Sequence, residues 1–374
     1  MFWLLLCIIL FVFVAFLSLT NRSFNKGKYI ILIVCIGIIA YHTIPLQTDD
    51  LFRYNAEMER LSNNSLKWAM ENGTWKTTTF SNIILFLFAK YNVEQFLPVI
   101  TATILIALFS FIIYKEIKKH DEYNAFSLLL AEFAFGAFLD IYLVMNIVRN
   151  TFAMAFFVIV VYLDYHKKIK IPLLKFLLYA LLPLFHSSML PIVLIVFFSK
   201  IKIPSKLKFL AIMLSPFFVQ GFTNLFGSIN LEFFDVFSQK SENYMGEYTM
   251  GESLGLTLIT LAMAVLVMVI LFGNLRNLKS KDIQKDNELE CSYIELLLSL
   301  TMAMFSMFFV SQALLFRLFP AIILLSSPYI YRFIITKTYG SDMKLVVCGM
   351  LFLCASARWV FQYINYFSIW QLEI

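Results

Sequence analysis

The chain has 374 residues, of which 60% are hydrophobic and 14% are charged, and its mean hydropathy is +0.79. This composition excludes an ordinary soluble globular protein. The net charge of +6 does not indicate nucleic-acid binding, because the lysines lie in short loops between apolar runs, where they orient a membrane protein. Many of these runs approach the ~20 residues that span a bilayer as a helix. Since backbone groups in lipid must be satisfied within their own segment, we predict an all-α integral membrane protein with one polytopic domain over residues 1–374.

The first apolar run, Met1–Leu19, has no basic residue ahead of it and no small-residue cleavage pattern after it. It is therefore predicted to be a span and not a cleaved signal peptide. Arg22, Lys26 and Lys28 follow it, so the positive-inside rule places the N-terminus outside and the first loop in the cytoplasm. The second span, Tyr29–Leu46, is expected to run outward.

A polar segment, residues 47–79, follows the second span and is too long for a simple turn. Loops of that size usually carry function or have structure of their own, and we expect this segment to lie outside and to be partly helical. The next apolar run, Phe80–Ala89, is too short to cross a bilayer. We interpret it as a re-entrant or interfacial helix.

Beyond this run, apolar stretches alternate with loops to the end of the chain. The predicted spans are Glu94–Tyr114, Tyr123–Met145, Ile147–Leu163, Leu173–Phe185, Ser187–Phe198, Leu210–Leu225, Leu254–Phe272, Tyr293–Val310, Leu314–Tyr331 and Leu345–Phe367. With the first two they make about 12 transmembrane helices, and both termini are then outside. The loop of residues 226–252 is acidic and is predicted to lie on the outer side as well.

The cysteines do not suggest a disulfide framework. Four of the five lie inside apolar runs, Cys291 begins another run, and no C-x-x-C pair occurs. The four histidines lack the spacing of metal ligands. We therefore predict no metal and no cofactor.

The stretch Ile147–Pro191 holds two apolar runs around a short basic turn, and this pattern predicts a membrane hairpin. Arg149 stands at the start of the first run and His186 at the end of the second. A hairpin returns its two ends to one membrane face, so both residues are expected on the same side. Ionisable residues at the edge of the hydrocarbon are costly, which makes both of them functional candidates.

Charged and titratable residues gather in the outer halves, or at the outer edges, of the predicted spans. They are Asp49, Asp50, Arg53, Asp140, Arg149, His186, Arg317 and Arg358. The arginines at 149, 317 and 358 predict an anion site, because guanidinium groups bind phosphate oxygens bidentately and stay charged at low dielectric. The alternative is that each arginine extends its head group to the membrane interface.

His186 is a candidate base, because an imidazole can take up a proton near neutral pH and the hydroxyls of Ser187 and Ser188 adjoin it. The alternative is a neutral histidine that is hydrogen-bonded at a helix end. Asp49 and Asp50 offer a base or hydrogen bonds to sugar hydroxyls. Their alternative role, as the N-cap of a following helix, is equally well supported.

Four segments in order, TDDLFRYNAEM, IVRNTFAMAFF, PLFHSSMLP and RLFPAI, resemble the EpsG group of Wzy-type polysaccharide polymerases. The resemblance spans most of the chain, and the order of the arginine and the F-H-S triplet is its most specific part. Asp50 and Tyr54 match the family's D-x-x-x-Y pattern, although here Asp49 doubles the aspartate. The resemblance implies a glycosyltransferase on the outer face of the bacterial cytoplasmic membrane. Its products would be O-antigen, capsule or exopolysaccharide.

The implied substrate is a polyprenyl-diphosphate-linked oligosaccharide repeat unit within the lipid bilayer, and the resemblance leaves a chain-length regulator protein open as a partner. Breaking a glycosyl–diphosphate bond requires stabilisation of a leaving dianion, which arginines can supply, and the acceptor hydroxyl requires a base. The implied roles are catalysis by His186 and Asp50, diphosphate binding by Arg149, Arg317 and Arg358, and substrate binding by Asp49, Arg53, Tyr54, Asp140 and Ser187. The rings of Tyr54, Trp68 and Trp75 could stack on sugars, and an interfacial aromatic belt is the favoured alternative.

Two other classes of membrane protein are compatible with the sequence. A flippase for lipid-linked oligosaccharides would have a similar size, but it should show internal repeats and a cavity that opens to both faces in turn. The charges here crowd one face, which favours a one-sided enzyme. A membrane acyltransferase with His186 as the base would need access for its acyl donor from the cytoplasm, where the chain shows only short basic turns.

Overall fold

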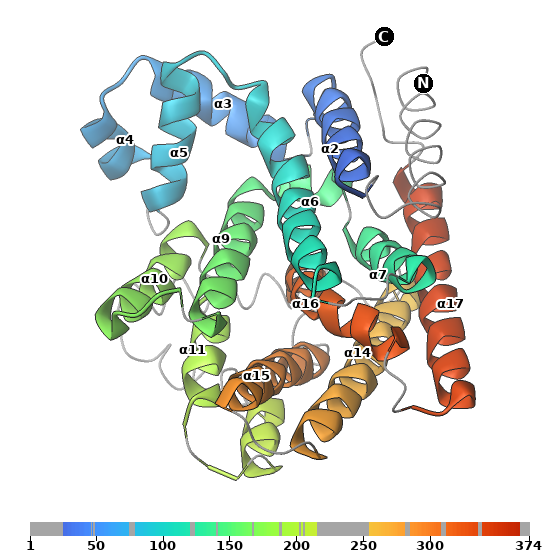
Figure 1. The fold of residues 1–374 in the computed structure, drawn as a ribbon. Helices are drawn as coiled ribbons and strands as arrows, with labels where there is room; N and C mark the ends of the chain where they lie inside the picture. Colours follow the sequence, from blue (N-terminus) through green and yellow to red (C-terminus); the bar gives the residue numbers. More distant parts are fainter. Residues whose placement is uncertain are drawn as a thin grey trace. The chain divides into compact units, whose positions relative to one another are not determined.

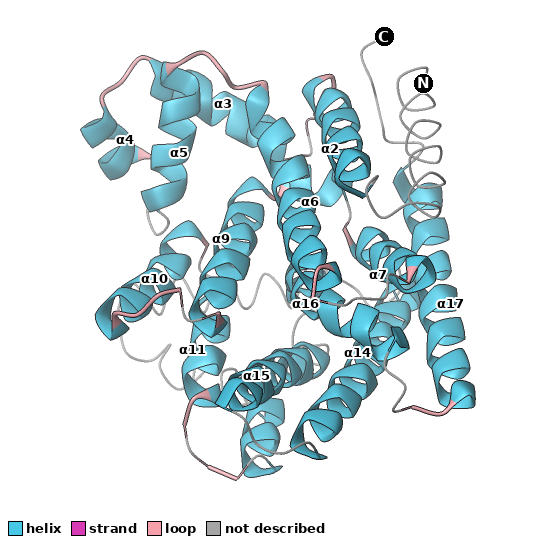
Figure 2. Cartoon of the chain, viewed as in Figure 1, coloured by secondary structure: helices cyan, strands magenta, loops and turns pink. Residues whose placement is uncertain are grey.

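The computed structural model describes residues 25–45, 47, 49–74, 79–119, 124–139, 141–166, 168–186, 189–201, 203–204, 206–214, 254–280, 285–307, 312–335 and 339–366 (Figure 1). Within these ranges the regular elements are α-helices and no strand occurs (Figure 2). This confirms the all-α prediction.

The helices follow the apolar runs of the sequence closely. The first nine described are α2 (Asn25–Tyr41), α3 (Asp50–Ser62), α4 (Leu66–Asn72), α5 (Thr79–Lys90), α6 (Phe96–Ile117), α7 (Ala125–Phe138), α8 (Ile141–Asn146), α9 (Val148–Tyr165) and α10 (Pro172–Phe185). They are followed by α11 (Met189–Ser199), α14 (Leu254–Ser280), α15 (Lys285–Met307), α16 (Gln312–Ile335) and α17 (Ser341–Tyr366).

Six helices in the described ranges are long and apolar enough to cross a membrane, namely α6, α9, α14, α15, α16 and α17. Five more are apolar but shorter, at 10–17 residues: α2, α5, α7, α10 and α11. Of the remaining predicted spans, Met1–Leu19 lies outside the described residues, and so does most of Leu210–Leu225. The chain is thus a multi-pass membrane protein, and the prediction of about 12 spans is not confirmed.

The predicted span Tyr123–Met145 is wrong as a single helix. It is divided into α7 and α8, with a break after Phe138. Asp140 follows this break in the sequence, and aspartate disfavours helix interiors because its side chain competes for backbone hydrogen bonds. The end of α8 is tied to α9, since the hydroxyl of Thr151 donates to the carbonyl oxygen of Val144 at 2.8 Å.

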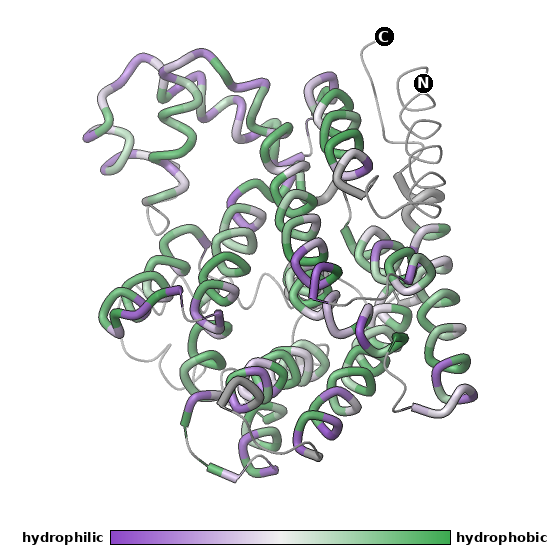
Figure 3. Tube along the Cα trace, in the orientation of Figure 1, coloured by the Kyte–Doolittle hydropathy of each residue, from purple (hydrophilic) through white to green (hydrophobic). Residues whose placement is uncertain are grey.

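The polar segment 47–79 is largely helical where it is described. Figure 3 shows hydrophilic residues recurring along α3 and α4, whereas α6 is hydrophobic along most of its length. On α3, Leu51, Tyr54, Met58 and Leu61 are buried and share one face. That spacing is typical of a helix that packs on a neighbour along one stripe. The outer location of this segment stays a prediction.

The chain divides into two compact units. Residues 1–132, 139–189 and 362–374 form the first unit, and residues 133–138 and 190–361 form the second. In the first unit, α6 packs against α2, α8 and α9, while α5 packs against α3, α4 and α10. In the second, α14, α15 and α16 pack against one another, and the side chain of Asn274 donates to the carbonyl oxygen of Tyr329 at 3.3 Å. A single polytopic domain over residues 1–374 stays a prediction, and the acidic loop 226–252 lies outside the described residues.

Candidate functional site

The predicted hairpin of α9 and α10 is present in the first unit. The two helices pack together beside the turn of residues 166–171, where Lys175 forms an ion pair with Asp164 at 2.7 Å. Pro172 occupies the first turn of α10, where it is well tolerated, and Pro183 lies in the last turn. Pro183 cannot donate a backbone hydrogen bond to Tyr179, which weakens the last turn, and α10 ends at Phe185.

Helix α3 is held against the start of α9 by an apolar cluster. Leu51, Tyr54 and Met58 of α3 pack in this cluster with Leu85 of α5 and Val148 of α9. Tyr54 is 2% exposed and therefore has a fixed place beside the N-terminus of α9. The cluster brings together parts of the chain that the sequence separates widely.

Arg149, in the first turn of α9, contacts Tyr54. Its Nε donates a hydrogen bond to the phenolic oxygen at 3.2 Å, and its Cζ lies 5.9 Å from the centre of the ring. Burial raises the pKa of Tyr54, while the charge of Arg149 and its hydrogen bond only partly oppose this. The phenol therefore stays protonated at neutral pH and accepts the hydrogen bond from the guanidinium.

The position of Arg149 is unusual for a cation. The N-terminus of a helix carries partial positive charge, so an arginine there adds a second attraction for anions instead of neutralising the first. The N-cap residue Ile147 has no side-chain acceptor for the first amides of the helix. The start of α9 thus combines a guanidinium and a helix N-terminus, the two protein groups that favour phosphate oxygens.

The two aspartates begin α3. Asp49 occupies the N-cap position with extended backbone, as one alternative predicted, but its side chain makes no capping hydrogen bond. Asp50 lies in the first turn and forms an ion pair with Arg53 at 3.3 Å, with side chains 39% and 68% exposed. Such a pair contributes little to stability. Asp50 is close enough to Tyr54 for its charge to contribute to the raised pKa of the phenol.

His186 caps the C-terminus of α10 and is 8% exposed. Its backbone N–H donates to the carbonyl oxygen of Leu182, and the hydroxyl of Ser81 donates to the carbonyl oxygen of Phe185 at 2.8 Å. The ring of Phe185 contacts that of Phe156 with centroids 5.3 Å apart. The end of α10 is therefore anchored to both α5 and α9.

The level of His186 along α9 follows from this contact. Phe156 is seven positions after Arg149, which corresponds to about 10 Å along the helix axis at 1.5 Å per residue. His186 adjoins Phe185 and thus lies about two helical turns further along α9 than Arg149. The two residues therefore lie in the half of the hairpin that is away from its turn, separated by about two helical turns along α9.

The other predicted site residues are either not described by the structure or belong to the second unit. Asp140 and Ser187 lie outside the described residues, and for Arg317 the structure describes the backbone of α16 but not the side chain. Arg358 of α17 is 3% exposed, and its guanidinium lies 5.5 Å from the ring centre of Phe138. Its burial disfavours the alternative of an arginine extended to the interface. Arg317 and Arg358 belong to the second unit, so their convergence with Arg149 stays a prediction.

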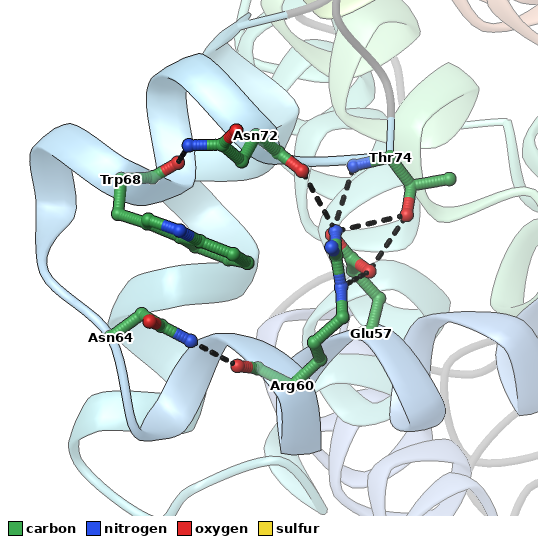
Figure 4. Close-up of polar contacts among 6 residues, drawn as sticks. All are labelled: Glu57, Arg60, Asn64, Trp68, Asn72 and Thr74. Carbon is green, nitrogen blue, oxygen red and sulfur yellow. Dashed lines mark hydrogen bonds and ion pairs between the residues drawn. The ribbon is translucent and has the colours of Figure 1, made fainter.

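The sequence reasoning missed a polar network on α3 and α4 (Figure 4). Glu57 is 6% exposed and accepts hydrogen bonds from Arg60, at 2.7 and 2.9 Å, and from the backbone and hydroxyl of Thr74 at 2.9 and 2.7 Å. Arg60 also donates to the carbonyl oxygen of Asn72 and lies 5.0 Å from the ring centre of Trp68. Trp68 packs against the apolar cluster, so it supports the fold of this segment.

A second feature that the sequence reasoning missed is a buried ion pair between α2 and α7. Nζ of Lys28 contacts the two carboxylate oxygens of Glu132 at 2.6 and 2.8 Å, and the hydroxyl of Tyr29 donates to the same carboxylate. Lys28 is 1% exposed. A glutamate within an apolar run was the available signal in the sequence.

Comparison with known proteins gives one result for nearly the whole chain. A family model described as the EpsG family matches residues 28–372. Neither the curated proteins nor the solved structures gave a match to the chain.

Proposed function

Because the chain belongs to the EpsG family of Wzy-like polysaccharide polymerases, we propose that it joins oligosaccharide repeat units that are linked to a polyprenyl diphosphate. The family and the apolar helices together indicate a multi-pass membrane protein of polysaccharide biosynthesis with a polymerase-type function. The reaction is proposed to take place on the outer face of the cytoplasmic membrane.

The observation that carries this proposal is the Arg149–Tyr54 pair at the N-terminus of α9. In the reaction, the bond between the anomeric carbon and the diphosphate oxygen breaks, and polyprenyl diphosphate leaves with the electron pair. Arg149 and the amides at the start of α9 bind the charge that develops on this leaving group. Since Tyr54 is buried and holds Nε of Arg149, the guanidinium is oriented before the substrate arrives.

The acceptor is a hydroxyl group of a second repeat unit, whose oxygen bonds to the anomeric carbon while its proton passes to a base. Asp50 and His186 are the two candidate bases. Asp50 is half-exposed and lies one helical turn from Tyr54, whereas His186 is buried and lies deeper along α9. Because a base must reach the acceptor proton directly or through one water, the nearer carboxylate is the candidate for a sugar bound at Arg149.

The test uses purified protein in liposomes with a polyprenyl-diphosphate-linked repeat unit, and it measures polymer length and rate on gels. Arg149→Ala should abolish polymer, and Arg149→Lys should retain only a small fraction, because lysine cannot form a bidentate contact. Tyr54→Phe keeps the ring but loses the acceptor, so the rate should fall about tenfold. Lys67→Ala, on the exposed side of α4, is the matched control and should polymerise normally.

If both Arg149→Ala and Arg149→Lys make polymer of normal length at the normal rate, Arg149 does not bind the diphosphate. In cells, deletion of the gene should leave a single repeat unit on its lipid carrier at the outer face. Accumulation of that unit on the inner face would instead identify a flippase.

A further inference from the structure

A groove runs between α2 and α6 on the surface of the first unit. It has a volume of about 370 Å³, within the range of about 300–1,000 Å³ that is usual for ligand pockets. Its α2 wall is built from residues four positions apart, such as Val34 and Ile38, which are 53% and 37% exposed. On α6 the wall includes Val99 and Thr103, whose hydroxyl donates to its own helix at 2.7 Å. These parts of both walls are therefore apolar.

Gly37 lines this groove on the α2 side. A Cβ placed on Gly37 would lie 3.5 Å from a methyl group of Val99 and 3.8 Å from a methyl group of Thr103, which is ordinary van der Waals contact. An alanine thus fits at this position without displacement of the helices. A larger side chain adds atoms beyond this Cβ, beside Val99 and Thr103, which line the groove.

The dimensions of the groove match one leaflet of a bilayer. The lining residues of α2 extend from Ile33 to Tyr41, which is about 12 Å at 1.5 Å per residue, and His42 follows the end of the helix. One leaflet accounts for half of the hydrocarbon core, or about 15 Å. Because α6 is one of the six candidate spans, a groove along it is expected to face the hydrocarbon.

One end of the groove is polar and lies beside the apolar cluster that contains Tyr54. Tyr41 and His42 line this end with Phe96, the first residue of α6. The next residue, Leu97, packs in the same apolar cluster as Tyr54 of α3 and Val148 of α9. The groove therefore opens beside the cluster that packs α3 against the start of α9, the helix that carries Arg149, and its mouth offers hydrogen-bond donors from a phenol and an imidazole.

We propose that the α2–α6 groove binds the polyprenyl tail of the lipid-linked donor. A linear apolar chain that ends in a diphosphate fits an apolar channel of one leaflet's length with donors at its mouth and an arginine site beyond. The inference rests on the proposed donor, and it assigns α2 and α6 a part in substrate binding. The competing occupant is the acyl chain of an ordinary phospholipid.

The first test detects binding without any need for polymer synthesis. Purified protein in nanodiscs of phosphatidylethanolamine and phosphatidylglycerol is irradiated with a polyprenyl diphosphate that carries a diazirine in its tail. Cross-links should concentrate on residues 33–42 and 96–103. Gly37→Leu should reduce them about tenfold, the equivalent of about 1.4 kcal/mol, whereas Gly37→Ala should retain them.

Leu177→Trp is the matched control, because this residue of α10 is 48% exposed and lies outside the groove. It should leave the cross-links unchanged. Unlabelled polyprenyl diphosphate should compete with the probe, and added phospholipid should not. The proposal is overturned if cross-links follow surface exposure on all helices, if Gly37→Leu does not reduce them, or if phospholipid competes equally well.

A second test uses activity. Gly37→Leu should raise the KM for a long-tailed donor about tenfold and leave the KM for a short-tailed donor unchanged. An equal rise for both donors would overturn the tail site while leaving the polymerase function intact. Groove-specific cross-linking in a protein that makes no polymer from either donor would overturn the proposed function and retain the lipid site.

Discussion

The buried pair of Lys28 and Glu132 should behave as one unit. Lys28 is 1% exposed and Glu132 12%, and both carboxylate oxygens contact the ammonium group. Removal of one partner leaves an uncompensated buried charge, which costs about 3–5 kcal/mol. Lys28→Met or Glu132→Leu alone should therefore destabilise the protein strongly. The double variant Lys28→Met/Glu132→Leu removes both charges together and should recover most of the loss.

The assay is thermal unfolding of purified protein in detergent, and a coupling free energy is taken from the four members of the cycle. Each single variant should lower the midpoint by on the order of 10 °C. The exposed pair Lys67–Glu71, at 3.9 Å and with side chains 84% and 59% exposed, is the control. Its variants should shift the midpoint very little. A double variant at 28 and 132 that is as unstable as the sum of its singles would refute the reasoning, because no coupling would then exist.

Three further predictions concern the site and its surroundings. Asp50→Asn should lower the polymerisation rate ~10²–10⁴-fold, the usual contribution of a base, whereas His186→Gln should still make full-length polymer; loss of long chains from His186→Gln at normal protein abundance would assign the base to His186 instead. Burial raises the pKa of Glu57, but hydrogen bonds from Arg60 and Thr74 outweigh it and leave that pKa below the usual 4.5. The stabilisation by Glu57 is thus complete above the unfolded-state pKa and is lost as the pH falls through the lowered folded-state value, so the difference in unfolding midpoint between the native protein and Glu57→Gln should shrink in acid. A reporter fused after Lys168 should read cytoplasmic and one after Asn243 external, and the opposite result would overturn the predicted orientation.

Features that depend on local sequence were predictable. The sequence predicts the limits of α10 at Leu173 and Phe185, and they are found at Pro172 and Phe185, because the apolar run is bounded by the basic turn before it and by His186 after it. The doubled aspartate is compatible with the start of a helix, and α3 begins at Asp50 with Asp49 at the N-cap position. Hydropathy alone located the six long spans.

Features that depend on long-range pairing were not predictable. Lys28 was counted as a loop residue by the positive-inside rule, and its partner Glu132 is 104 positions away. Arg149 and Tyr54 are 95 positions apart, so both could be flagged as polar residues near a membrane face but not as a pair. Trp68 was a candidate for sugar stacking, but a single sequence does not reveal that the ring packs under Arg60 and against the apolar cluster.

The polar segment, residues 47–79, does more than connect two helices, because its folded structure holds Tyr54 in place. Glu57 lies one turn after Tyr54 on α3, and its hydrogen bonds fasten that helix to the chain at Thr74. The apolar stripe of α3 fastens the same helix to α5 and to the start of α9. Tyr54 is fixed by both sets of contacts, and it in turn holds the guanidinium of Arg149. It follows that a change at Glu57, which need not touch substrate, should lower the polymerisation rate by loosening the arginine that binds the leaving group.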